Sequence, residues 1–227
     1  LVEAASALAD ILTPRASAER HNTRSKELND ELAECRRCCS AGNDHVHHGR
    51  AQAPLNLKVH TGRGQIGYDV NSTMVIGEKD ILLIDPQFSL SEAHKLAAEI
   101  LESKKTLAVI YCTHPHPDHL FGLAVLKQAF PEAKIVALAA TVNAAKTGWP
   151  ARQKFWFATY GNNIPGPEPV LPDALDAPVL TLEGEQFPIT GGVQGADGPG
   201  NSFVYIPSLN AVVTGDIVFD HVYFGVP

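Results

Sequence analysis

The stretch that decides the fold is LAVIYCTHPHPDHLFG, residues 107–122. Its first six residues form a nearly continuous apolar run, which predicts a short strand covered on both faces. Cys112, at the end of this run, is expected to be a buried small hydrophobe. Three histidines and one aspartate then follow within six residues. Ligand-type side chains clustered at a strand's carboxyl end predict a functional loop rather than a polar surface turn.

The residue types in this loop suit a divalent metal. Neutral imidazoles and carboxylates are the natural ligands of Zn²⁺ and related ions. His114 and His116 are two residues apart, so in extended chain their side chains point the same way. Pro115 and Pro117 restrict the backbone and stiffen the loop. Asp118 and His119 follow where the chain turns into the next helix, which lets adjacent residues face a second metal.

Hydrophobic patterning extends this view to the rest of the chain. Strands alternate with helices in the middle and run as hairpins at both ends, which suits helices packed outside stacked mixed sheets. We expect Ser91 to cap the first helix and the Pro/Gly-rich residues 161–178 to form a connection. The predicted strands are 55–60, 71–77, 79–85, 107–112, 134–137, 179–182, 186–190, 203–207 and 211–214, and the predicted helices are 89–103, 122–130 and 139–147.

Residues 1–54 differ from the remainder, and we interpret them as a loosely structured or helical leader before one domain at 55–227. Within the leader, the pair Cys35-x-x-Cys38 precedes several histidines, but it lacks a second paired motif. A flexible segment is therefore favoured over a metal knuckle. The tripeptide Ala7-Leu8-Ala9 resembles a signal-peptidase site without the preceding apolar region. Localisation stays open, with export to the periplasm or medium as one alternative.

Composition limits the classes of partner. The 227 residues are 44% hydrophobic and 19% charged, as is usual for a soluble globular protein. The formal net charge of −7 and the lack of a basic stripe argue against nucleic-acid binding. The longest apolar runs are too short to cross a bilayer. We therefore expect a small-molecule substrate and neither nucleic acid nor membrane as a partner, and the sequence predicts no oligomeric state.

The pattern His114-x-His116-x-Asp118-His119 resembles the signature of the metallo-β-lactamase superfamily. Two flanking segments agree with it: residues 82–85 (LLID) resemble the family's strand ending in Asp, and residues 211–216 (AVVTGD) resemble its later strand ending in Gly-Asp. The resemblance covers about residue 55 to the end. It implies an α/β fold, the αββα four-layer sandwich, with a mono- or dinuclear metal site at one edge of the sheets and the last C-terminal elements lacking.

Carried over by residue, the resemblance implies that His114 and His116 bind a first metal. Asp118 and His119 would bind a second metal, and Asp216 would bridge the two. Zinc is the expected ion, with iron or manganese as alternatives. A metal-bound hydroxide would be the nucleophile, with its pKa lowered by the cations. Asp118 would be the catalytic residue that orients this water and takes its proton.

The chain departs from the family's pattern at two points. The family supplies a third first-site histidine before the final Gly-Asp, and residues 191–202 contain none. Gln194 or Asp197 would replace it with an oxygen donor, or the first site is weak. The family's last histidine lies tens of residues beyond Gly-Asp, whereas only eleven residues follow Asp216. His221 is a weaker candidate for that role.

The resulting functional hypothesis is a metal-dependent hydrolase that cleaves an ester, lactone, lactam or similar bond. The absent histidine favours one alternative, a non-catalytic binding or scaffold relative with a degraded site. An iron-bearing oxidoreductase on the same fold is another, because this ligand set also suits iron.

Two further features are open to a functional and a structural interpretation. Gly62-x-Gly64-x-x-Gly67 matches the dinucleotide-binding spacing, but strand-type residues follow it where that motif needs a helix. A hairpin turn is favoured, with a substrate-covering flap as an alternative. The aromatic residues between Trp149 and Tyr160 would either pack together or line a substrate pocket, and packing is favoured.

Overall fold

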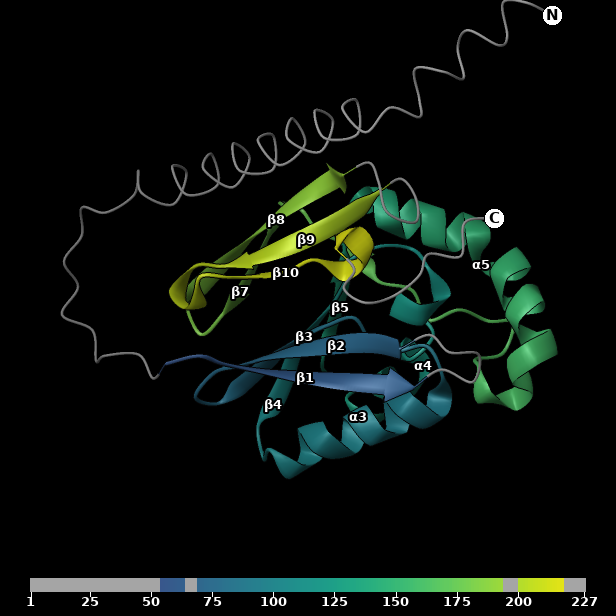
Figure 1. Cartoon of the computed structure of the whole chain (residues 1–227), viewed down its shortest axis with the longest axis horizontal. Coiled ribbons are helices and arrows are strands. Elements are labelled where there is room, and N and C mark those ends of the chain that lie inside the picture. The colour runs from purple at the N-terminus through teal and green to yellow at the C-terminus, as the bar shows by residue number, and fades with distance from the viewer. Residues whose placement is uncertain (1–53, 64–68, 194–199, 219–227) are drawn as a thin grey trace, which may run out of the picture. The chain divides into compact units, whose positions relative to one another are not determined.

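Two β-sheets and their flanking helices make up the part of the chain that the computed structural model describes, residues 54–63, 69–193 and 200–218 (Figure 1). The larger sheet has 6 strands in the order β1-β2-β3-β4-β5-β6, and the smaller has 4 in the order β10-β9-β8-β7. The arrangement confirms the expected α/β fold class with two stacked sheets, of which only the larger is mixed. The leader proposed for 1–54 lies outside the described residues except for Pro54, so that boundary stays a prediction.

The larger sheet joins an antiparallel half to a parallel half. Strands β1, β2 and β3 pair antiparallel, and β3, β4, β5 and β6 pair parallel. The carboxyl ends of β3 and β4 therefore meet at one edge, where ligands usually bind in such sheets. The strands are β1 Asn56–Arg63, β2 Asp69–Ile76, β3 Asp80–Ile84, β4 Thr106–Cys112, β5 Lys134–Ala137 and β6 Asp173–Ala174.

The smaller sheet is antiparallel throughout and packs on the larger one through an apolar layer. Leu82, Ile84 and Tyr111 of the larger sheet are fully buried in this layer together with Phe187 and Val204 of the smaller sheet. The strands are β7 Val179–Leu182, β8 Glu185–Val193, β9 Asn201–Ile206 and β10 Ala211–Val213.

Helices α3 (Leu90–Glu102) and α4 (Leu123–Ala129) share a second core with the larger sheet. Helix α3 buries Leu96 and Ile100 along one face. Its N-cap is Ser89, whose hydroxyl accepts a hydrogen bond from the N–H of Glu92. The prediction of Ser91 as the cap was therefore wrong by two residues, because two serines both precede the apolar face.

Helix α5 spans Ala139–Tyr160 and passes through Pro150. The sequence prediction ended this helix at 147 and was wrong, although Gly148 and Pro150 are residue types that disfavour a helix interior. Tertiary packing overrides that preference: Trp149 and Tyr160 are buried against Phe88 and Phe121. None of the helices described combines the length and the apolar character that a membrane crossing requires.

The glycine motif, Cys112 and four short 3₁₀ segments complete the described fold. The first glycine of the Gly-x-Gly motif lies in β1, which pairs antiparallel with β2, as a hairpin requires. Gly64 and Gly67 lie outside the described residues, so the turn itself stays a prediction. Cys112 is buried, as expected. The remaining described elements are short 3₁₀ segments: η1 Pro117–His119, η2 Gly161–Asn163, η3 Pro207–Leu209 and η4 Gly215–Ile217.

Candidate metal centre

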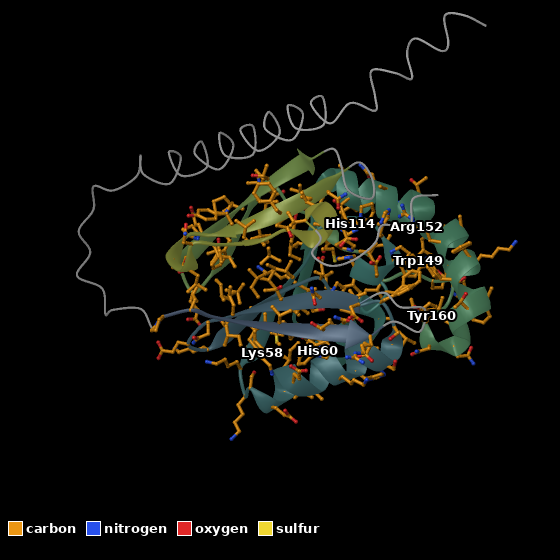
Figure 2. All side chains as sticks on the ribbon, viewed as in Figure 1. Lys58, His60, His114, Trp149, Arg152 and Tyr160 are labelled. Carbon is orange, nitrogen blue, oxygen red and sulfur yellow. The ribbon has the colours of Figure 1, made fainter. Side chains whose placement is uncertain are left out.

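The predicted ligand residues come together at the edge where β3, β4 and β10 end. The loop after β4 carries His114 and His116, and η1, which follows at once, carries Asp118 and His119. Asp216 lies in η4, directly after β10. Figure 2 shows His114 at this end of the sheets, beside α5. Residues about a hundred positions apart in the chain thus form one cluster.

The cluster is tight. Ligand atoms of His114, His119 and Asp216 all lie within 4.8 Å of one another. His119 Nε2 lies 3.1 Å from Asp216 Oδ1 and 3.2 Å from Asp118 Oδ2, and His114 Nε2 lies 3.6 Å from Asp216 Oδ2. The ring of His116 centres 4.9 Å from that of His114. The structure therefore brings His114, His119 and Asp216 together as one group, with Asp118 beside His119 and His116 beside His114.

Burial differs within the cluster in a way that suits a site open to solvent on one side. His114 and His119 are buried, whereas His116, Asp118 and Asp216 are partly exposed. Asp216 keeps 20% of its side chain accessible. The accessible part of the cluster therefore includes both predicted carboxylate ligands. The other candidates, Gln194, Asp197 and His221, lie outside the described residues, so their roles stay predictions.

Asp85, the residue after β3, contacts both the ligand loop and His119. Its Oδ1 accepts a hydrogen bond from the N–H of Thr113 at 2.8 Å, and its Oδ2 accepts one from the Thr113 hydroxyl at 2.8 Å. The same Oδ2 lies 2.8 Å from Nδ1 of His119, on the far side of the ring from Asp118 and Asp216. The contact does not meet hydrogen-bond geometry here, but a carboxylate this close favours the neutral tautomer with the proton on Nδ1, which leaves Nε2 able to bind a cation.

Gly215 allows η4 to approach the β4 loop closely enough to deliver Asp216. Its φ is +51°, and a Cβ added there would lie 2.7 Å from the Thr113 hydroxyl oxygen. Any side chain at this position would therefore push η4 away from the loop. Glycine also adopts the left-handed conformation without steric cost.

The electrostatics of the cluster favour a positive charge at its centre. Burial opposes protonation of His119, but Asp85, Asp118 and Asp216 outweigh it and raise the pKa of this imidazole well above its usual range. Burial likewise opposes ionisation of Asp118, but His119 and its neighbouring histidines lower the pKa of the carboxyl to about 2. Without a metal, a proton on His119 balances the carboxylates, and a bound cation can replace that charge.

The distances in the cluster fit a divalent metal. Zinc binds imidazole nitrogen and carboxylate oxygen at about 2.0–2.2 Å, which separates two tetrahedral ligand atoms by about 3.3 Å. The observed separations of 3.1 Å and 3.6 Å between the histidine nitrogens and Asp216 bracket that value. Separations of this size allow Asp216 to share a cation with either histidine.

Sequence reasoning missed two residues beside the cluster. Asp85 was noticed only as the end of a family-like strand, and the parallel pairing of β3 with β4 is what brings it under His119. Arg152 carried no sequence signal, yet its Nη1 donates a hydrogen bond to the Pro115 carbonyl oxygen at 2.6 Å. The aromatic residues nearby mostly pack together, although Phe155 is 69% exposed.

Comparison with known proteins assigns the family. The sequence model of the metallo-beta-lactamase superfamily matches residues 66–223, more than half of the chain. Solved structures that resemble the chain include the B3 metallo-beta-lactamase BLEG-1, with a TM-score of 0.57, 18% identity and coverage of 73% of this chain and 74% of that one. The metallo-beta-lactamase DIM-1 has a TM-score of 0.53, 17% identity and coverage of 71% and 69%.

A beta-lactamase domain protein from Burkholderia ambifaria has a TM-score of 0.52 and 11% identity, and the match covers 74% of this chain and 56% of that one. No curated protein matches the sequence. At these identities the likeness of structures shows the fold alone, and the family assignment follows from the sequence match. The chain belongs to the metallo-beta-lactamase superfamily.

Proposed function

We propose that this protein is a metal-dependent hydrolase that cleaves an ester, lactone, lactam or similar bond of a small molecule. The observation that carries the proposal is the convergence of His114, His119 and Asp216 atoms within 4.8 Å of one another. In this proposal His114 and His116 hold one cation, Asp118 and His119 hold a second, and Asp216 lies between them. Zinc is the expected ion, and iron or manganese is the alternative.

A divalent metal at this site supplies Lewis acidity and makes water a nucleophile near neutral pH. The protein's own residues hold the metal and supply a charged carboxylate beside it. Asp118 has a pKa of about 2, so it stays ionised at neutral pH. An ionised carboxylate can orient the attacking water and accept its proton. We therefore assign Asp118 both of these roles.

A second candidate function is that of a non-catalytic relative that binds small molecules without cleaving them. The feature that favours it is the sequence 191–202, which carries no histidine where the family supplies one. An iron-bearing oxidoreductase is a third candidate, because imidazole and carboxylate ligands also suit iron. Metal identity and hydrolytic activity separate the three.

The test combines metal content with a substrate panel. Purified protein reconstituted with zinc, manganese or iron is assayed for bound metal and for hydrolysis of β-lactam, lactone, thioester and phosphodiester substrates. We expect one or two equivalents of metal and turnover of at least one carbonyl substrate. Fewer than about 0.2 equivalents of every metal at neutral pH would contradict the proposal.

Matched variants show whether any activity belongs to this site. Asp216→Asn keeps the shape of a predicted ligand and removes its charge, so it should lower metal content and turnover together. Glu102→Gln also replaces a carboxylate with an amide, on an exposed residue at the end of α3 just before the amino end of β4, and should leave both unchanged. Metal binding without turnover of any substrate would favour the non-catalytic relative.

A further inference from the structure

The loop that carries the predicted ligands is held from outside by α5. Pro115 lies between His114 and His116, and its carbonyl belongs to the peptide bond that precedes His116. Nη1 of Arg152 donates a hydrogen bond to this carbonyl oxygen at 2.6 Å. On the other side, the His116 carbonyl accepts a hydrogen bond from the N–H of His119 at 3.1 Å. The backbone of His116 is thus restrained at both ends, and Arg152 supplies one restraint.

Helix α5 is itself fixed to the segment that follows the loop. Trp149 is 3% exposed, and its ring centre lies 4.9 Å from that of Phe121, two residues after His119. Residues three apart lie on the same face of a helix, so Arg152 leaves α5 on the face that Trp149 anchors. Figure 2 shows Arg152 and His114 close together at this end of the molecule.

Gly148 makes room for the Arg152 side chain. Long helical side chains lean back over the residue four positions earlier, and for Arg152 that residue is Gly148. A Cβ added at Gly148 would lie 2.8 Å from Nη1 and 2.9 Å from Cζ of Arg152. Glycine inside a helix is unfavourable relative to alanine, so Gly148 makes α5 less stable than alanine would at this position. The space it leaves is filled by the guanidinium that reaches Pro115.

We propose that Arg152 is a positioning residue for the metal-binding loop, and that Gly148 is required because it leaves space for the Arg152 guanidinium. The inference rests on the proposed metal function of the loop. Arg152 acts through the Pro115 carbonyl and is not itself a ligand. It presets the orientation of the His116 backbone, so less ordering is needed when a cation binds.

The decisive variant is Gly148→Ala. Added to a helix interior, alanine should leave the folding stability of the metal-free protein unchanged or raise it. The same methyl group should displace the flexible end of Arg152 and weaken zinc binding by about 10-fold, the lower limit of the loss typical for outer-shell partners. A merely structural disturbance would lower both the folding stability and the metal affinity. Gly148→Ala should instead lower the metal affinity without lowering the stability.

The measurements are the zinc Kd by competition with a chromophoric chelator, unfolding of the metal-free protein, and the cobalt absorption spectrum. Arg152→Met should weaken zinc binding to a similar extent and alter the cobalt bands, and Arg152→Lys should recover part of the affinity because it keeps a donor. In a double-mutant cycle, Gly148→Ala should add nothing to Arg152→Met, because both remove the same contact. Gly166→Ala, with no atom within 4 Å of the added Cβ, and Lys154→Met on the exposed side of α5 are the controls.

The outcomes separate this inference from the proposed function. Wild-type affinity in both Gly148→Ala and Arg152→Met would overturn the positioning role and leave the proposed function standing. Additive losses in the cycle would overturn the shared contact. Failure of the wild-type protein itself to bind zinc would overturn the inference together with the proposed function.

Discussion

Replacing Asp85 with asparagine tests how its buried carboxylate, which contacts His119, affects metal binding. The side chain is 2% exposed and bonds the backbone N–H and the hydroxyl of Thr113. Asparagine keeps the shape and tolerates the left-handed backbone found here, where φ is +63°. Its carbonyl oxygen must face the N–H of Thr113, because the opposite orientation would place two donors against each other.

That orientation places the amide NH₂ where Oδ2 now lies, 2.8 Å from Nδ1 of His119. A donor in this place favours the tautomer with the proton on Nε2, the nitrogen that faces Asp118 and Asp216. A proton there opposes a cation directly. Loss of an outer-shell partner typically costs 10–100-fold in metal affinity, so we expect zinc Kd to rise by about that factor, or about 1.4–2.7 kcal/mol.

The assay is a zinc titration of wild type and Asp85→Asn, paired with urea unfolding of the metal-free proteins. Asparagine should reduce stability by only about 1–2 kcal/mol, because Thr113 keeps a partner for each group. Asp85→Ala leaves two buried donors unpaired and should cost about 2–6 kcal/mol. If Asp85→Asn bound zinc within twofold of wild type, the tautomer argument would be refuted and Asp85 would serve the fold alone.

Three further predictions concern stability. The Glu183 carboxylate accepts hydrogen bonds from the backbone N–H groups of Glu78, Lys79 and Asp80, which outweigh the opposing effect of burial and lower its pKa. Glu183→Gln should therefore cost about 1 kcal/mol at neutral pH in urea unfolding, and the difference should vanish as the pH falls through the lowered pKa. Tyr111→Phe removes the buried 2.7 Å hydrogen bond to Ser202 that links the two sheets, and thermal unfolding should show a loss of about 1 kcal/mol; an unchanged Tm would contradict that role. Zinc at 100 times its Kd should stabilise the fold by about 2.7 kcal/mol and raise the Tm by about 5–10 °C, whereas a chelator should reverse the shift.

Local patterning was enough to predict the strand 107–112 and the ligand loop after it. The continuous apolar run of β4 predicts its burial on both faces, and the residue types of the loop predict metal binding. The distant partner Asp216 was found only through the family resemblance, because nothing in local sequence shows that β10 ends beside β4. The structure places it 3.1 Å from His119.

What could not be predicted depends on contacts between elements far apart in the sequence. The continuation of α5 through Pro150 reflects the burial of Trp149 and Tyr160 against aromatic residues from other segments. Propensity alone ends the helix at that proline. The contact of Arg152 with Pro115 depends in turn on that longer helix, since a helix ending at 147 would not carry Arg152 on the same face as Trp149.

The most direct test of the central claim is an anomalous difference map at the zinc absorption edge, from crystals of zinc-loaded protein. The predicted result is one or two peaks, each about 2.0–2.2 Å from Nε2 of His114 or of His119, with an Asp216 oxygen at the same distance. Strong peaks only at other residues, or no peak here at saturating zinc, would contradict the claim that these side chains bind a common metal centre.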